Sequence, residues 1–239
     1  MDINCDLGEG EPAARTRRLL RWVSSANIAC GGHAGNKRTM RACMRLCHEF
    51  RVNAGAHPGF DDRQNFGRKE EAISWSRLQL LIASQVGTLV SLAQAEGIPI
   101  AHVKLHGGLY HVVERDRHLA SVYAAFIKER FPGVRLIVSP HGELIGAARN
   151  RGIQVWGELF SDRAYTPEGG LMPRSQPGAV LSDLAEIRRQ METFLASGRV
   201  SSTKGTLVRL DAQTICVHAD SPKALPIARL VASLFHADA

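Results

Sequence analysis

The chain has 239 residues, of which 44% are hydrophobic and 22% are charged. This composition is ordinary for a globular protein with a sizeable core, and it argues against disorder. The formal net charge of +7 favours anionic ligands. The basic residues are scattered, however, so we do not expect nucleic acid as a partner.

The cysteines and the N-terminal stretch bear on the cellular compartment. Five cysteines without CxxC spacing argue against a disulfide framework or a zinc ribbon. The start, MDINCDLGEGE, lacks the basic and apolar succession of a secretory signal. No run approaches the roughly 18 apolar residues that a membrane-spanning helix requires. These features predict a cytoplasmic protein with reduced cysteines and no membrane partner.

Short β-type runs alternate with helical patterns along the whole chain. The expected strands are 2–6, 26–30, 52–57, 100–106, 134–139, 153–159 and 213–218. The expected helices are 13–24, 37–50, 71–96, 115–130, 142–151, 181–197 and 222–236. This alternation is typical of a parallel sheet. Seven units without a linker favour one α/β domain over 1–239, a closed or nearly closed barrel, with an open doubly wound sheet as the alternative.

Two turn-rich segments, 56–70 and 160–179, are longer than ordinary connections. Loops of this length in a compact domain are often binding loops or lids. We therefore expect both segments to border a functional site.

Polar side chains recur on one face of several expected strands. In the stretch IAHVKLHGGLY, His102, Lys104 and His106 alternate with apolar residues. The same alternation selects one face of four other strands, with the side chains Asn4, Asp6, Asn53, His57, Gln154, Glu158, Cys216, His218 and Asp220. Parallel barrels hold their active sites at the carboxyl ends of the strands. We therefore expect these groups to meet around a pocket inside one mouth of the barrel.

The side chains in this set suggest acid–base chemistry on an anionic substrate. Lys104, paired with Asp6 or Glu9 or else partly desolvated, would hold an anion or stabilise an oxyanion. The histidines His33, His57 and His106 are candidate general acids or bases. One carboxylate with two histidines can also bind a divalent metal, but no local HxxxH spacing decides this, so a metal stays an open alternative.

Several common motifs are absent from the sequence. It contains no GxxxxGK[ST] phosphate loop, no GxGxxG after a strand and no GxSxG nucleophile elbow. Serine-hydrolase chemistry is therefore disfavoured. The stretch GGHAG at 31–35 fits an anion-binding turn and a flexible turn equally well.

Blocks of sequence in the same order resemble the LamB/YcsF family. They are INCDLGEGE (3–11), NIACGGHAG (27–35), GAHPGF (55–60), FGRK (66–69), HVKLHGGLY (102–110), DRAYTPEGGLMPRSQPGAVL (162–181) and TICVHAD (214–220). The resemblance implies a distorted seven-stranded β/α barrel related to the glycoside hydrolase/deacetylase superfamily. It also implies the role of the A subunit in ATP-dependent 5-oxoprolinase, which opens 5-oxo-L-proline to L-glutamate together with separate subunits B and C.

Five positions depart from the usual pattern of the family, which has an aromatic residue at 32, Asp-Pro at 36–37, Pro at 105 and Ala at 108. This chain has Gly32, Asn36, Lys37, Leu105 and Gly108. The ionisable residues of the pattern are retained. The departures therefore concern loop shape more than chemistry, and they leave room for a changed substrate preference.

From the strand pattern and this resemblance together we assign roles to eleven residues. The expected catalytic residues are Asp6, Glu9, His57, Lys104 and His106, and the expected substrate-binding residues are Asn4, His33, Glu158, Arg163, His218 and Asp220. ATP, with Mg²⁺, would phosphorylate the amide oxygen, after which water attacks and phosphate leaves. Lys104 and Arg163 would hold the substrate carboxylate or phosphoryl oxygens, and we expect alanine at Lys104 or His106 to abolish turnover with little loss of thermal stability.

Two rival functions stay open from the sequence. One is a metal-dependent deacetylase or amidohydrolase of a small amide or sugar. The other is a non-catalytic subunit that binds substrate for its partners. Homo-oligomer formation and the identity of the ATP-binding component are also left open.

Overall fold

A closed barrel of seven parallel strands forms the centre of the computed structural model, which describes residues 1–235. Neighbouring strands follow the order β1-β2-β3-β4-β5-β6-β9, and β9 closes the barrel against β1. Their bounds are β1 (Asp2–Leu7), β2 (Ser25–Ala29), β3 (Asn53–His57), β4 (Ile100–Lys104), β5 (Arg135–Val138), β6 (Val155–Phe160) and β9 (Thr214–Val217). The closed sheet rules out the open doubly wound alternative and confirms the expected fold.

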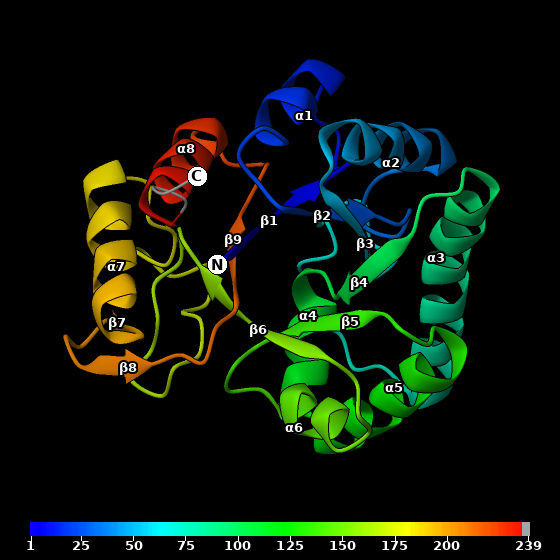
Figure 1. Cartoon of the computed structure of the whole chain (residues 1–239). Coiled ribbons are helices and arrows are strands. Elements are labelled where there is room, and N and C mark those ends of the chain that lie inside the picture. The colour runs from blue at the N-terminus through cyan, green and yellow to red at the C-terminus, as the bar shows by residue number, and fades with distance from the viewer. Residues whose placement is uncertain (236–239) are drawn as a thin grey trace.

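Helices surround this barrel on its outside (Figure 1). They are α1 (Ala13–Leu19), α2 (Lys37–Phe50), α3 (Trp75–Ala95), α4 (Gly107–Arg115), α5 (Arg117–Arg130), α6 (Glu143–Arg149), α7 (Leu184–Ser197) and α8 (Ala224–Phe235). The hairpin of β7 (Arg199–Ser201) and β8 (Leu207–Arg209) lies beside α7, apart from the barrel.

All seven expected barrel strands are present, and the differences concern their ends and the short elements. The strand expected over 100–106 ends at Lys104, and His106 is instead the residue that precedes α4. Helix α4 and the β7–β8 hairpin were not expected. The helix expected over 13–24 ends at Leu19. The last position of the helix expected over 222–236 lies outside the described residues.

Helix α2 has the bounds expected from the sequence, and its first turn shows how the sequence determines where it begins. The Asn36 side chain accepts hydrogen bonds from the backbone N–H groups of Arg38 and Thr39, which caps the first turn. The helix buries a face that includes Cys43 and Cys47. All five cysteines are buried and free, as expected.

Helix α3 corrects the expectation that no segment is apolar and long enough to span a membrane. Its 21 residues are long and apolar enough, by length and composition alone, to cross a membrane. The helix nevertheless buries one stripe, which includes Leu78, Ile82 and Val86, and exposes Leu80 on the other side. It also packs on α2, α5, β3 and β4. We therefore interpret it as an outer helix of the barrel.

Polar side chains fill one level of the barrel interior. The register pairs Asp6 with Asn27, Asn27 with Gly55, and Gly55 with His102, so four successive strands contribute to one layer. A Cβ atom on Gly55 would lie 2.1 Å from Nε2 of His102, so glycine is required for this ring to fit. His102 Nε2 in turn lies 2.8 Å from Oδ1 of Asn27. The predicted inward face of β4 is therefore present.

Candidate active site

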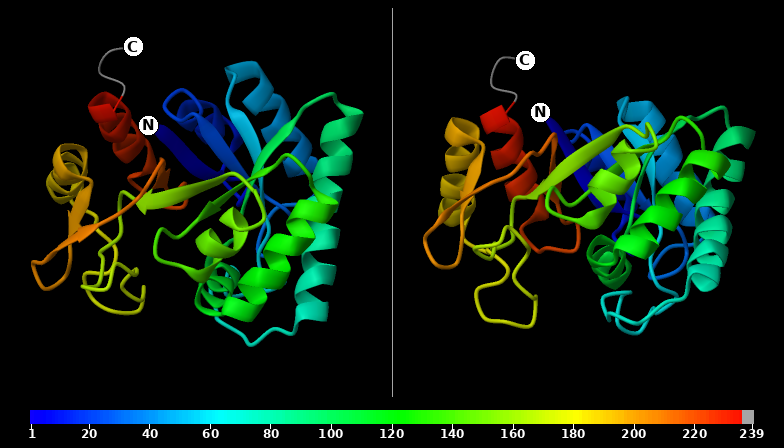
Figure 2. Two further views of the ribbon diagram at one scale, coloured as in Figure 1. Left: turned by 60° about the horizontal axis from the view of Figure 1, so that its bottom comes forward. Right: turned by 90° about the horizontal axis from the view of Figure 1, so that it is seen from below.

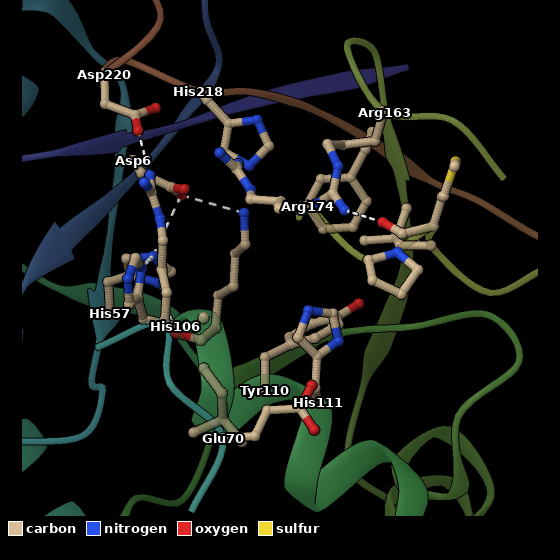
Figure 3. A pocket seen from close by; sticks show the side chains of 18 of the residues that line it. Asp6, His57, Glu70, His106, Tyr110, His111, Arg163, Arg174, His218 and Asp220 are labelled. Carbon is tan, nitrogen blue, oxygen red and sulfur yellow. Dashed lines mark hydrogen bonds and ion pairs between the residues drawn. The ribbon is translucent and has the colours of Figure 1, made fainter. Parts of the chain in front are cut away.

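The two long segments meet at the carboxyl end of the barrel. In Figure 2 they lie along the lower edge of the molecule, away from the N-terminus. Between them is a pocket of about 320 Å³, a size that suits a small organic ligand. Asp6, His57 and His106 stand on one side of this pocket, and Arg163, Tyr110 and His111 on the other (Figure 3).

Lys104 is the centre of a buried ionic network at the floor of the pocket. Its Nζ atom lies 2.7 Å from Oε1 of Glu158 and 3.1 Å from Oδ1 of Asp6. It also lies 3.2 Å from Oδ1 of Asn4 and 3.1 Å from Sγ of Cys216. Four acceptors thus compete for three N–H groups. Lys104 consequently pairs with two carboxylates, which belong to strands β1 and β6.

The pairing sets the charge states of this network. Burial by itself would raise the pKa of Asp6, but the Lys104 ammonium overrides it and holds that pKa well below the usual range. Burial would likewise lower the pKa of Lys104, yet Asp6 and the other acidic neighbours raise it well above the ordinary value. Both groups therefore stay ionised at neutral pH.

Glu9, His33, His57 and His106 form a second group, which we call the histidine cluster. Nε2 of His33 lies 2.9 Å from Oε1 of Glu9, and Nε2 of His57 lies 3.0 Å from Nδ1 of His106. The rings of His33 and His106 stack with centroids 3.6 Å apart. All four groups thus converge on one point beside the Lys104 network.

Glycines make room for this stacking. A Cβ atom on Gly59 would lie 2.7 Å from Nδ1 of His33, and one on Gly67 would lie 2.6 Å from Cβ of the same residue. Gly67 also has a φ of +62°, a conformation that glycine adopts without strain. The turns of the 56–70 segment are therefore shaped around the histidine cluster.

Burial shifts the titration of the cluster. It lowers the pKa of His33 to about 3, with a further contribution from the His57 charge. Burial and His33 likewise hold the pKa of His106 well below its ordinary value. Burial and the neighbouring Asp6 raise the pKa of Glu9 well above the usual range. The rings of His33 and His106 are therefore neutral at neutral pH.

Cations from the 160–179 segment line the opposite wall. Arg163 is buried and donates to the backbone carbonyls of Ala179 and Met172, at 3.2 and 2.6 Å. Burial and the nearby charge of Arg174 lower the pKa of Arg163 to about 10. Within residues 1–235, neither guanidinium has a carboxylate partner. We call Arg163 and Arg174 the arginine pair.

The other charged groups of the pocket are already matched. His218 Nδ1 lies 2.8 Å from Oδ1 of Asp162. Asp220 forms an ion pair with Arg68 at the pocket edge. Arg115 contacts Glu70 at 2.7 Å. Among the described residues that line the pocket, the arginine pair is therefore available to bind an anionic ligand.

Most of the site residues expected from sequence lie together. Those that line the pocket are Asp6, Glu9, His57, Lys104, His106, Arg163, His218 and Asp220. His33 completes the histidine cluster, while Asn4 and Glu158 lie deeper and contact Lys104. The expected pairing of Lys104 with Asp6 is present, at 3.1 Å. Glu9, the alternative partner, instead joins the histidines, and Glu158 is a second partner that was not expected.

Sequence reasoning missed three residues of the site. Asn27 donates to both Asn4 and Asp6, Asp162 pairs with His218, and Arg174 supplies a free cation. Asn27 lies on β2 at a position whose side chain faces the barrel interior, and the alternation along the strand could have identified it. Arg174 lies in a segment without periodicity, so no sequence pattern pointed to it.

Two of the departures from the family pattern occur where the backbone is crowded. A Cβ atom on Gly32 would lie 2.4 Å from Nε2 of Gln85, and one on Gly108 would lie 2.4 Å from the carbonyl oxygen of Lys69. The Gln85 side chain holds Gly59 by two hydrogen bonds, at 2.8 and 3.1 Å. A buried glutamine thus occupies space beside Gly32 and fixes the loop that carries Gly59.

The fold and the site define a class: a β/α-barrel protein with paired acids, imidazoles and an ammonium group at the carboxyl ends of its strands. The chain belongs to the LamB/YcsF family, whose model it matches over residues 1–239. It is similar to the A subunit of 5-oxoprolinase from Erwinia tasmaniensis, with 41% identity over 235 residues that cover 98% of this chain and 95% of that protein.

A solved structure supports the same relationship. The crystal structure of the lactam utilization protein from Thermus thermophilus has a TM-score of 0.90 and 38% sequence identity to this chain. The match covers 99% of this chain and 96% of that one. The barrel is therefore shared with this relative along essentially its full length.

Proposed function

We propose that this chain is the A subunit of an ATP-dependent 5-oxoprolinase, which opens the lactam of 5-oxo-L-proline to L-glutamate. The observation that carries the proposal is the near full-length similarity to a protein of that name. The pocket at the carboxyl end of the barrel is consistent with it, because it combines ionised carboxylates, imidazoles and free guanidinium groups.

The arginine pair suits the carboxylate of 5-oxoproline. Arginine binds carboxylates through parallel N–H groups, and both guanidiniums lack a carboxylate partner within the part of the chain described. Arg163 already donates hydrogen bonds to two backbone carbonyls. It therefore anchors the 160–179 segment as well, and Arg174 has the greater freedom to meet the ligand.

A lactam is a resonance-stabilised amide, so its carbonyl needs activation. ATP, with Mg²⁺, would phosphorylate the amide oxygen and release ADP. One water then adds to the ring carbon, and the C–N bond breaks as a proton reaches nitrogen, which leaves an acyl phosphate. A second water releases phosphate and gives glutamate. The groups in this pocket able to position and deprotonate water are Asp6, Glu9, His57 and His106.

We propose for Lys104 a role that differs from the one expected from the sequence. Its N–H groups already face Asp6, Glu158, Asn4 and Cys216. It therefore keeps Asp6 ionised and positioned beside His57, whose Nε2 lies 3.5 Å from Oδ1 of Asp6. In this proposal Lys104 is a positioning residue for the chemistry.

The partners in this proposal are subunits B and C, and the assembled enzyme acts in the cytoplasm. The chain itself contains no GxxxxGK[ST] loop. We therefore propose that ATP turnover depends on the assembled enzyme.

A phosphate-release assay with 5-oxoproline tests the proposal, run on the chain alone and with subunits B and C. We expect release that depends on 5-oxoproline only in the complete mixture. Hydrolysis of simple amides by the chain alone, without ATP and inhibited by a chelator, would favour the metal-dependent amidohydrolase instead. Calorimetric binding of 5-oxoproline to the chain, together with full turnover by subunits B and C when the chain is left out, would favour a non-catalytic binding subunit.

A further inference from the structure

The ring nitrogens of His57 and His106 face each other in an arrangement that two neutral imidazoles do not favour. Nδ1 of His57 lies 2.8 Å from the backbone oxygen of Lys104. Nε2 of His106 lies 2.8 Å from the backbone oxygen of Phe66. A carbonyl oxygen only accepts hydrogen bonds, so each of these nitrogens carries a proton.

The remaining nitrogens therefore present lone pairs to one another. Nε2 of His57 and Nδ1 of His106 are 3.0 Å apart, in a buried site. Two lone pairs at this distance repel unless a positive centre lies between or beside them. Either an additional proton or a cation satisfies this requirement.

Two further donors point to the same place. Oε1 of Glu9 lies 3.5 Å from Nδ1 of His106, 3.9 Å from Nε2 of His57 and 2.9 Å from Nε2 of His33. All four donor atoms lie within 4.8 Å of one another. Tetrahedral zinc with nitrogen ligands at about 2.05 Å sets its ligands roughly 3.3 Å apart. The observed separations bracket that spacing.

The surroundings of His57 and His106 match those of metal-binding histidines, whereas Nδ1 of His33 has no hydrogen-bond partner among the described residues. Metal-binding histidines usually donate the other ring N–H to a carbonyl or carboxylate, which fixes the tautomer, and His57 and His106 both do so. Phe66, whose carbonyl orients His106, has a φ of +56°, an unusual value for a residue other than glycine. The site also borders the pocket, because Glu9, His57 and His106 line it.

We propose that Glu9, His33, His57 and His106 bind one divalent transition-metal ion of the zinc type. Three nitrogen donors and one carboxylate suit such an ion better than Mg²⁺, which prefers oxygen ligands. With an ion bound, Glu9, His57 and His106 would act as ligands and no longer as bases, and the ion would supply Lewis-acid polarisation at the wall of the pocket. The inference does not depend on the identity of the substrate.

A second group of three donors, Asp6, Cys216 and His218, is the weaker candidate. The ammonium of Lys104 already lies 3.1 Å from both Asp6 and Cys216, so a cation would be repelled. Burial also raises the pKa of the Cys216 thiol well above its ordinary value, which opposes thiolate formation.

Metal titration of chelator-treated protein tests the proposal without any substrate. We expect one equivalent of Zn²⁺ or Co²⁺ to bind, a Co²⁺ absorption spectrum of tetrahedral intensity, and a rise in melting temperature with added Zn²⁺. Binding should be lost in His57→Ala and His106→Ala and retained in the matched control His111→Ala, which changes a pocket histidine outside the cluster.

Three results would overturn the proposal. The first is a folded wild-type protein that binds neither ion, with ¹⁵N spectra showing an imidazolium proton shared by His57 and His106. The second is binding that survives in both cluster variants. The third is loss of binding in His218→Ala instead. Should the alanine variants unfold, His33→Gln and the wild-type melting shift still decide the question.

Discussion

The two walls of the pocket are built differently. The histidine cluster and the Lys104 network stand on β1, β3, β4, β6, β9 and the turns directly after the strands, and neighbouring backbone carbonyls fix two of the rings. The arginine pair stands on the long segment after β6, beyond the last residue of that strand. This contrast suggests that the reactive groups are held rigidly by the barrel, while substrate recognition resides in a loop that can vary independently.

The largest effect should follow from removing the cation of the rigid wall. Lys104→Met leaves Asp6 and Glu158 buried without their partner, so we expect the free energy of unfolding to fall by about 3–5 kcal/mol. This replaces the sequence-based expectation of little stability loss. Chemical denaturation measures the change.

Two further variants control this experiment. The exposed Lys128→Met should change stability by less than about 0.5 kcal/mol. Adding Glu158→Gln to Lys104→Met should recover part of the loss, because it removes one uncompensated charge. An unchanged denaturation midpoint in Lys104→Met would show that the network is not the buried ionic centre described above.

A smaller effect should follow from a change in the recognition wall. Arg174→Ala removes an exposed cation facing the ligand, so we expect KM for 5-oxoproline to rise roughly tenfold while kcat changes little. Steady-state kinetics of the reconstituted enzyme measure both. The exposed Arg130→Ala serves as control, and a fall in kcat with an unchanged KM would place Arg174 in the chemistry instead.

The smallest effect concerns a buried acid outside both walls. Burial raises the pKa of Glu114 to about 8, although the backbone N–H groups of Ser139 and Leu144 oppose the shift. A carboxyl group with a raised pKa binds its proton more tightly in the folded state. Its contribution to stability is therefore complete below the unfolded pKa and is lost as the pH rises towards 8.

Thermal melts at several pH values test this assignment. We expect the melting temperature to decline between pH 5 and pH 9, as this carboxyl loses its proton in the folded protein. The decline should flatten in Glu114→Gln. A Glu114→Gln profile parallel to that of the wild type would show that this carboxyl does not titrate in the range.

The sequence predicted the rigid wall better than the recognition wall, for a physical reason. Alternation along β4 sets the direction of His102 and Lys104, and this is a local property of a strand. The pairing of Lys104 with Glu158 depends on how β6 and β9 register against β1, which no local pattern encodes. Hence the inward face and the pairing of Lys104 with Asp6 were predicted, and the pairing with Glu158 was not.

Segments without periodicity were harder to predict from the sequence. Arg174 approaches the pocket only because the 160–179 segment folds back, where Leu181 donates to the carbonyl of Asp162. The short helix α4 begins at Gly107, whose φ of +51° ends the strand pattern early. In both places the path of the backbone depends on contacts distant in sequence.

Glutamate formation by the complex reconstituted with His106→Ala tests the central claim most directly. The claim is that the carboxyl end of this barrel carries the ring opening of 5-oxoproline. We predict that glutamate formation falls by about 10²–10⁴-fold, while the exposed control His118→Ala retains full activity and both variants remain folded. Wild-type rates with a folded His106→Ala chain would contradict the claim.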